Sequence, residues 1–326
     1  MPRVSICIPT YQRPDLLKVA VRSCLTQTFQ DFEIVISDDS PDIRTQDVVR
    51  NLSASQPIAY WRNTPGLGQA KNVNRLFNLA SGEFLVLLHD DNFLTPNALA
   101  DLMVPLQENT SIVASFGKQY LVTHEGTILD RESTALNERY SKTDDRANKI
   151  QRPEWSVLAA QFPPDGYMVR TTAAQKTLYR DSPDVGDACD ADFGFRLTKL
   201  GKFFLVAKYV SAYRMTRESI SSKGLRTALS HLYFLVQDLP VPEDLKPLQN
   251  KRLRELAPVA VNGCLLRAAR RKALGILTSR NYPWNQQFVK GVVQLGLVFA
   301  PKAASKLLTI QRNKHDRRLR MKRKQG

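Results

Sequence analysis

Apolar and polar residues follow two alternating periods over the first hundred positions of this chain. Apolar residues recur with helical spacing, three to four positions apart, over roughly residues 14–25, 45–52 and 69–80. Between these stretches lie short apolar runs rich in β-branched residues, which predict strands at residues 4–8, 32–36, 58–61 and 84–88. Strands that alternate with helices predict an α/β fold, with a mostly parallel sheet flanked by helices.

The rest of the chain shows a weaker pattern and then a helical one. Short strands are predicted at residues 112–116, 120–122 and 203–207, while the polar stretch 130–153 predicts a mobile loop or irregular insert. From about Leu225 the apolar spacing is helical, with a break at Pro240 and Pro242. We therefore expect two domains, residues 1–224 with the sheet and residues 225–326 as a helical region.

The charge of the chain is concentrated at one end. Of the formal net charge of +16, residues 1–250 contribute −1, from 28 basic and 29 acidic residues, and residues 251–326 contribute +17, from 19 basic and 2 acidic residues. A basic end of this kind attracts phosphate, and we favour an anionic membrane surface as its partner over a merely solvated tail. Apolar side chains at Val292, Val293, Leu295, Leu297, Val298 and Phe299 are predicted to enter the interface while residues 317–324 meet anionic lipid. A nucleic-acid partner is not expected, because interleaved aromatic residues and known binding motifs are missing.

Cysteine usage and hydropathy indicate the compartment. The four cysteines are far apart and form no CxxC pair, which favours a reducing environment without a disulfide framework. The first residues lack the apolar core of a signal peptide, and no run reaches the length of a bilayer span. We expect a cytoplasmic protein that docks peripherally on the inner face of the cell membrane.

Candidate chemistry lies where predicted strands end. Thr10 and Tyr11, Asp38 and Asp39, and the pair Asp90-Asp91 each follow a strand, and the carboxyl ends of parallel strands meet in one cleft. Adjacent carboxylates at a buried strand end are costly without a cation, and their oxygens suit Mg²⁺ or Mn²⁺. The alternative is that both acidic pairs simply begin turns, because Asp favours turns.

Three further segments contain charged residues, and each allows two interpretations. Lys71 lies in the first turn of a predicted helix after Gly68, where an anion binds well, or it is simply solvated. Asp190 and Asp192 either supply a base for an acceptor hydroxyl or only complement a helix dipole. Arg214 either holds a phosphate bidentately or lies in a surface loop.

Taken in order, these segments resemble family 2 glycosyltransferases of GT-A fold, which are Rossmann-like. The segment 9–13, Pro-Thr-Tyr-Gln-Arg, is similar to the family start "PTYNR", and the segment 68–72 is similar to its "G-x-A-R-N" phosphate segment. Asp90-Asp91 resembles the metal-binding DxD motif, and Asp190 lies six residues before Arg196, as the family base does. The likeness covers roughly residues 3–222.

The resemblance implies inverting, metal-dependent transfer from a nucleotide-diphosphate sugar, often a UDP sugar, with Mn²⁺ or Mg²⁺. Such enzymes build surface polysaccharides or glycolipids, so the implied acceptor is a glycan or lipid-linked hydroxyl. By position, Asp91 would bind the metal, Asp190 would act as the base, and Arg214 and Asp192 would lie near diphosphate or acceptor. Nucleotide contacts would come from Pro9, Thr10, Tyr11, Arg13, Asp38, Asp39, Lys71 and Asp90. The alternative function is a catalytically inactive nucleotide-sugar-binding protein.

Overall fold

The computed structural model describes residues 1–52, 56–216 and 220–300, with the side chains of 220–226 left undescribed. Its contacts divide the chain into two compact units. The sheet unit comprises Met1–Asp181 and Cys189–Ser219, and the helical unit comprises Ser182–Ala188 and Ile220–Gly326. Each unit is treated separately below, and the prediction that they are independent domains stays a prediction.

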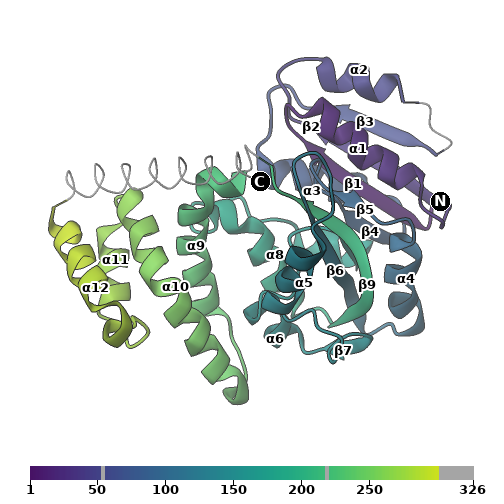
Figure 1. The fold of residues 1–326 in the computed structure, drawn as a ribbon. Coiled ribbons are helices and arrows are strands. Elements are labelled where there is room, and N and C mark those ends of the chain that lie inside the picture. The colour runs from purple at the N-terminus through teal and green to yellow at the C-terminus, as the bar shows by residue number, and fades with distance from the viewer. Residues whose placement is uncertain (53–55, 217–219, 301–326) are drawn as a thin grey trace. The chain divides into compact units, whose positions relative to one another are not determined.

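The sheet unit is built around one nine-stranded mixed sheet (Figure 1). Its strand order is β3-β2-β1-β4-β8-β6-β9-β5, with β7 also paired to β9. Strands β1 to β4 are parallel, as is the pair β6 and β9, whereas β5, β7 and β8 run antiparallel to their neighbours. The strands are β1 Val4–Thr10, β2 Phe32–Asp38, β3 Ile58–Arg62, β4 Phe84–Leu87, β5 Phe93–Leu94, β6 Ile112–Val122, β7 Lys149–Gln151, β8 Tyr167–Arg170 and β9 Lys202–Arg214.

Helices cover both faces of this sheet, as the predicted α/β fold requires. Even-numbered residues of β1 and β2, such as Ile6 and Ile34, belong to one buried cluster with Leu17 of α1 and Leu102 of α4. On the opposite face, the thiol of Cys7 lies 3.7 Å from a backbone oxygen of α3. The helices of the unit are α1 Pro14–Leu25, α2 Arg44–Arg50, α3 Gln69–Leu79, α4 Ala98–Glu108, α5 Asp130–Arg139, α6 Pro153–Leu158, α7 Thr171–Thr177 and α8 Cys189–Leu197. The predicted fold class is confirmed.

Register places the ends of β1 and β2 side by side. Val4 pairs with Phe32, and the ladder continues to Thr10 opposite Asp38. The next backbone N–H, that of Asp39, donates to the carbonyl of Thr10 at 3.0 Å. The polar residues that follow each strand are therefore held at one edge of the sheet.

Two predicted boundaries differ from the structure. The stretch 130–153 is not irregular, because it contains α5 and β7. The inward face of α5 is polar, with Ser133 and Asn137 buried and hydrogen-bonded to β6, so its helical period carries no apolar signal. The two strands predicted at 112–122 are one strand, β6, whose irregular register with β9 interrupts its alternation.

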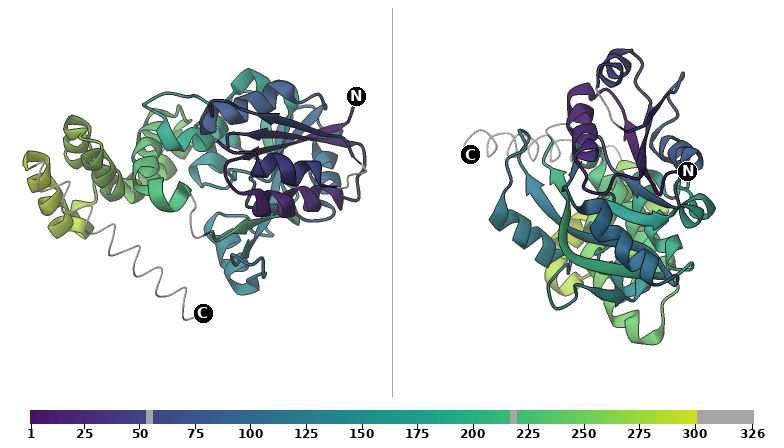
Figure 2. Two further views of the ribbon diagram at one scale, coloured as in Figure 1. Left: turned by 90° about the horizontal axis from the view of Figure 1, so that it is seen from above. Right: turned by 90° about the vertical axis from the view of Figure 1, so that its right-hand side faces the viewer.

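The helical unit consists of helices packed side by side (Figure 2). Its central helix is α10, which contacts α9, α11 and α12. The elements are η1 Gly186–Ala188, α9 Ile220–Asp238, η2 Glu243–Leu245, α10 Lys246–Leu266, α11 Arg270–Leu277 and α12 Trp284–Phe299. Among the described residues, none of the helices has both the length and the hydropathy needed to cross a bilayer.

Candidate active site

The end of β1 and the acidic turn after β4 are joined by hydrogen bonds. The hydroxyl of Thr10 donates to Asp90 Oδ2 at 2.8 Å, and the backbone N–H of Tyr11 donates to the same oxygen at 3.3 Å. Arg13 Nη1 lies 3.3 Å from Asp90 Oδ1 and 2.8 Å from Asp91 Oδ2. Pro9, half-buried at the end of β1, precedes these contacts, and the side chain of Tyr11 is exposed.

The acidic pair fits a divalent cation. Burial and then the neighbouring Asp91 charge raise the pKa of Asp90 to about 6, against the opposing effects of Arg13 and Thr10. A second positive charge would relieve this repulsion. Within the described residues, no cluster of three or more His, Cys, Asp or Glu side chains has the arrangement of a metal site. A set of only two carboxylates still suits Mg²⁺ or Mn²⁺, because these ions take their other ligands from phosphate and water.

Asp38 and Asp39 point to different places. Asp38 is fully buried and accepts from the hydroxyl of Tyr60 at 2.6 Å and from the backbone N–H of Ser40 at 2.8 Å. Asp39 accepts from Asn63 Nδ2 at 2.6 Å and from the backbone N–H of Gly68 at 2.8 Å. Asp39 therefore organises the glycine segment before α3, while Asp38 ties β2 to β3.

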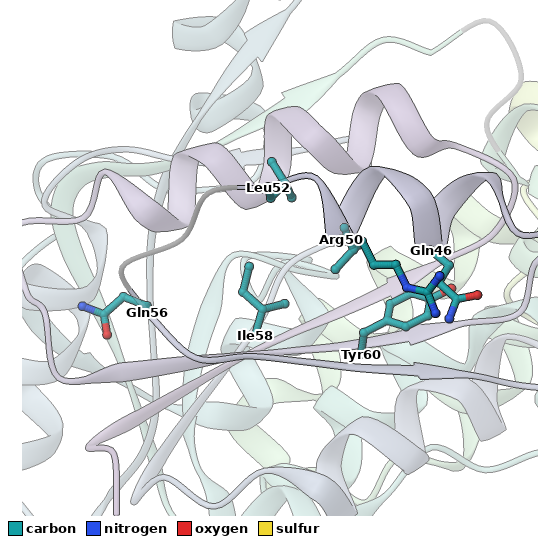
Figure 3. A pocket seen from close by; sticks show the side chains of 7 residues that line it. Gln46, Arg50, Leu52, Gln56, Ile58 and Tyr60 are labelled. Atoms are coloured by element: carbon teal, nitrogen blue, oxygen red, sulfur yellow. The ribbon is translucent and has the colours of Figure 1, made fainter.

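A cavity of about 330 Å³ lies between α2 and β3. Figure 3 shows the side chains that line it, among them Arg50, Ile58 and Tyr60. None of the predicted site residues lines it, although Tyr60 reaches Asp38 with its hydroxyl. The lining of this cavity thus reaches the acidic residues of the sheet edge through the Tyr60 hydroxyl.

Lys71 lies in the first turn of α3, as the sequence predicts. The helix follows Gly68, whose φ of +82° is a conformation that glycine adopts without a Cβ penalty. The Lys71 ammonium is exposed and pairs with Asp181 Oδ2 at 3.2 Å. An exposed pair of this kind contributes little stability, about 0–1 kcal/mol, so the ammonium is available to an anion at small cost.

Asp190 begins α8 and is electrostatically coupled to the acidic turn. Its carboxylate is half-buried and accepts from the backbone N–H of Ala191 at 2.7 Å. Burial raises the pKa of Asp190, while that hydrogen bond and the charge of His89 oppose the rise. Burial lowers the pKa of His89, but Asp165 and three other carboxylates outweigh it and leave this pKa above its ordinary value. His89 directly precedes Asp90, so the charge of the turn acts on the candidate base.

The side chain of Asp192 forms ion pairs with two arginines. It is almost fully buried, and both its oxygens lie 3.0 Å from Arg180 Nε. Arg196 Nε donates to it at 2.8 Å, and the other nitrogens of Arg196 bind the carbonyls of Thr177 and Leu178. Asp192 thus fixes α8 to the end of α7, and a direct contact with donor or acceptor stays a prediction.

Arg214 supports the acidic turn from the end of β9. Its Nε donates to the carbonyl of Asp91 at 2.8 Å, and its Nη1 donates to the carbonyl of His124 at 2.8 Å. Burial lowers the pKa of the Arg214 guanidinium, against the attraction of Asp91. The side chain is buried, so its predicted phosphate contact would require these hydrogen bonds to rearrange.

Two buried residues at this edge were missed in the sequence. Asn63 follows β3 and bonds Asp39, Ser37 and Asn72, although the rule that polar residues after parallel strands form the site already indicated it. Asp165 precedes β8, an antiparallel strand, and no local signal marks it.

Comparison with known proteins identifies relatives. A family model described as "Glycosyl transferase family 2" matches residues 5–160. A GalNAc(5)-diNAcBac-PP-undecaprenol beta-1,3-glucosyltransferase of Campylobacter jejuni is 38% identical over 226 residues, which cover 69% of this chain and 68% of the relative. A UDP-Glc:alpha-D-GlcNAc-diphosphoundecaprenol beta-1,3-glucosyltransferase, WfaP of Escherichia coli, is 27% identical over 121 residues, which cover 37% of this chain and 47% of the relative.

Solved structures share the fold. The crystal structure of S. aureus TarS 1–349 in complex with UDP has a TM-score of 0.59 at 15% identity, covering 97% of this chain and 91% of that one. The mannosyltransferase PcManGT from Pyrobaculum calidifontis, in complex with GDP-Man and Mn²⁺, has a TM-score of 0.57 at 16% identity, covering 94% of this chain and 84% of that one. At these identities the likeness concerns the fold alone.

Proposed function

Because the chain belongs to glycosyltransferase family 2 and is a glycosyltransferase, we propose that it transfers one sugar, with inversion, from a UDP sugar to a hydroxyl of a lipid-linked glycan. The observation that carries this proposal is the shared location of three acidic groups. The backbone N–H of Asp39 donates to the Thr10 carbonyl, the Asp90 carboxylate accepts from Thr10 and Tyr11, and the charge of His89, the residue before Asp90, acts on Asp190.

The relatives support the substrate classes. The Campylobacter and Escherichia relatives are named as glucosyltransferases acting on undecaprenol-diphosphate-linked sugars, and the Escherichia name specifies UDP-Glc as the donor. The structural neighbours are complexes with UDP and with GDP-Man and Mn²⁺. A nucleotide-diphosphate donor and an acceptor in glycolipid or polysaccharide synthesis are the chemistry common to this group.

The chain's own residues would hold the donor along the sheet edge. We assign the nucleoside to Pro9, Thr10, Tyr11, Asp39 and the more distant Asp38, and the diphosphate to Lys71 and Arg13. In the structure Arg13 balances the charge of the acidic pair, so it is placed to exchange one partner for another when the donor arrives.

Asp91 and Asp90 would hold Mn²⁺ or Mg²⁺. When bound, the cation neutralises negative charge on the leaving diphosphate. Thr10 and Tyr11 fix the carboxylate of Asp90, and Arg214 fixes the backbone of Asp91, so the turn that carries both residues is held before any ligand binds. Such preorganisation is how a site stabilises developing charge without reorganising.

Asp190 would take the proton of the acceptor hydroxyl. The acceptor oxygen forms a bond to the anomeric carbon as the bond from that carbon to the phosphate oxygen breaks. The acceptor proton passes to the Asp190 carboxylate, and the nucleotide diphosphate leaves with the electron pair. The raised pKa of Asp190, caused first by burial, makes its carboxylate a stronger base than an exposed one.

The helical unit would dock on an anionic membrane surface that carries the lipid-linked acceptor. Helix α12 exposes Phe288, Val289, Val292, Val293 and Phe299. These positions correct the predicted face, because Leu297 and Val298 are buried in the unit and Phe288 and Val289 take their place. The basic residues 317–324 lie outside the described residues. The apolar face and the charge of +17 over residues 251–326 together favour an anionic lipid interface.

A donor screen tests the proposed reaction. Purified protein is incubated with a panel of nucleotide sugars, a short lipid-linked glycan acceptor and Mn²⁺ or EDTA, and released nucleotide diphosphate and glycosylated product are both measured. We expect product formation with a UDP sugar that EDTA abolishes and that Asp91→Ala and Asp190→Ala each remove. A protein that binds UDP but forms no product with any donor would be a nucleotide-sugar-binding protein instead.

A further inference from the structure

The turn that carries the candidate metal ligands is held from the protein interior by Asp165. This carboxylate is fully buried. Its Oδ2 accepts from the backbone N–H of His89 at 3.1 Å and from Asn92 Nδ2 at 2.8 Å. One oxygen therefore fixes both ends of the turn, on either side of Asp90 and Asp91.

Arg214 completes the attachment from the other side. Asn92 Oδ1 accepts from the backbone N–H of Arg214 at 2.9 Å, and Arg214 Nε donates to the carbonyl of Asp91 at 2.8 Å. Asn92 is thus a bridge whose amide joins Asp165 to β9. Rotation of the peptide units at Asp91 would break at least one of these hydrogen bonds.

The backbone beside Asp165 is itself fixed. The N–H of Gly166 donates to the carbonyl of Leu87 at 2.8 Å, which joins this segment to the end of β4. A Cβ at Gly166 would lie 2.3 Å from Ser211 Oγ, and the residue has a φ of +70°, so only glycine fits here. Asp165 is therefore presented to the turn from a backbone that cannot easily shift.

A purely structural explanation of Asp165 is weak on energetic grounds. Its second oxygen, Oδ1, is buried and has no hydrogen-bond partner within the described part of the chain. A buried carboxylate that leaves one oxygen unpaired costs free energy that a neutral side chain at the same place would avoid. The charge provides two charge-assisted hydrogen bonds, which are stronger and geometrically stricter than neutral ones, and the same Oδ2 also lies 3.9 Å from His89 Nδ1, at the start of the turn.

We propose that Asp165 is the positioning residue that holds the turn at residues 89–92, and through it the Asp91 carboxylate, in the orientation that a metal-bound diphosphate requires. This inference rests on the proposed function, because it assigns Asp165 a task in that reaction. It concerns orientation only, since Asp165 touches neither Asp90 nor Asp91 with its side chain.

The central experiment measures Mn²⁺ binding with UDP present, by electron paramagnetic resonance of free Mn²⁺, in Asp165→Asn and Asp165→Ala. We expect the dissociation constant for Mn²⁺ to rise about 10-fold for Asn and about 100-fold for Ala, the range found when groups supporting metal ligands are removed. Hydrogen exchange of the peptide covering residues 89–92 is measured on the metal-free protein. We expect its exchange to accelerate in Asp165→Ala, while peptides of β1 and β2 keep their protection.

A matched control separates positioning from general destabilisation. Asn137→Ala removes three buried hydrogen bonds to the backbone of Gln119 and Ser133, away from the turn. We expect it to lower the melting temperature at least as much as Asp165→Asn and to leave Mn²⁺ binding unchanged. A metal affinity that falls equally in the control would overturn the proposal.

A double variant tests the hydrogen bond itself. Asn92→Ala removes the bond from the side of the turn, and Asp165→Ala removes it from the interior. Because both changes break the same bond, we expect the double variant to lose less Mn²⁺ affinity than the two single losses combined. Fully additive losses, or wild-type Mn²⁺ binding in Asp165→Ala, would show that Asp165 does not position the turn. If the wild type transfers no sugar but these binding shifts appear, the proposed function fails and the role of Asp165 stands.

Discussion

The sheet unit and the helical unit differ in how they treat their apolar and charged side chains. In the sheet unit the exposed large apolar residues lie singly on different elements, such as Val19 on α1, Val104 on α4 and Ile150 on β7. In the helical unit five of them share the single helix α12. Scattered apolar residues are normal on any surface, whereas a contiguous group marks an interaction surface.

The two units also differ in the sign and placement of their charged side chains. Acidic side chains of the sheet unit are buried and partnered at the sheet edge, where Asp38, Asp39, Asp90 and Asp165 each accept hydrogen bonds. The region from residue 251 onward has almost no acidic residues and many basic ones. Under the proposed function, one unit would serve a cation and a phosphate, and the other would serve an anionic surface. The expectations below test this division, from the largest effect to the smallest.

Asp190→Asn should have the largest effect. Removing a general base reduces the rate by about 10²–10⁴-fold, because the acceptor proton then has no carboxylate to receive it. UDP binding, measured by calorimetry, should be unchanged. The matched control is Asp187→Asn, an exposed acid of η1 whose partner is Thr227 in the helical unit. Near-normal transfer by Asp190→Asn would contradict the assignment of the base.

Asp192→Ala should have the largest effect on stability. Its removal takes a buried carboxylate away from Arg180 and Arg196, and losing a hydrogen bond to a charged group of this kind costs about 1.5–3 kcal/mol of the free energy of unfolding. In the helical unit, Asp184→Ala removes an exposed carboxylate paired with Lys272 and should cost less than about 1 kcal/mol. Urea unfolding of both variants measures the difference, and equal losses would show that Asp192 is not a structural centre.

Phe288→Ser should weaken membrane docking without affecting the fold. A buried Phe side chain contributes about 1.5–3 kcal/mol, so binding to vesicles of phosphatidylglycerol should fall about tenfold or more. The control, Val104→Ser, changes an exposed apolar residue of the sheet unit and should leave flotation unchanged. Transfer to a water-soluble acceptor should be the same in both. If Phe288→Ser floated with vesicles as the wild type does, α12 would not be part of the docking surface.

Lys142→Met should change how stability depends on pH. Burial lowers the pKa of Lys142 to about 7, although Asp165 opposes the shift. Between about pH 7 and 10.4 the unfolded chain holds a proton that the folded chain lacks, so wild-type stability should rise with pH, by up to about 1.4 kcal/mol per unit. Lys142→Met should lack this slope, and it should be more stable than the wild type at pH 7 by a margin that narrows as pH rises. The exposed Lys18→Met is the control, and urea unfolding from pH 6.5 to 10 measures all three.

The fold was predictable where strands are mostly buried. Strands β1, β2 and β4 are short, mostly apolar and buried, and the half-buried β3 still has an apolar run, so their sequence pattern alone indicated them. Strands β5 and β8 were missed, because they have two and four residues and exist through pairing with β9 and β4. Local periodicity contains no information about such long-range partners.

The candidate site was predictable where its residues lie at the ends of the predicted parallel strands. Thr10, Asp39 and Asp90 each follow a parallel strand, so one topological rule placed them together. Asp165 precedes an antiparallel strand that was itself not predicted, and only the pairing of β8 with β4 brings it under the acidic turn. The buried polar contacts of Arg214 likewise depend on β9 extending to its end beside β6, well beyond the predicted strand.

The chain leaves the sheet unit after Asp181, inserts Ser182–Ala188 among the helices, and returns at Cys189. Val185 and Ala188 of this segment are buried, and Ala188 lies two residues before the candidate base. Modular exchange of the C-terminal part between relatives therefore cannot be a simple cut after residue 219. A foreign helical partner would have to accommodate the same segment, whose chain continues directly into Asp190.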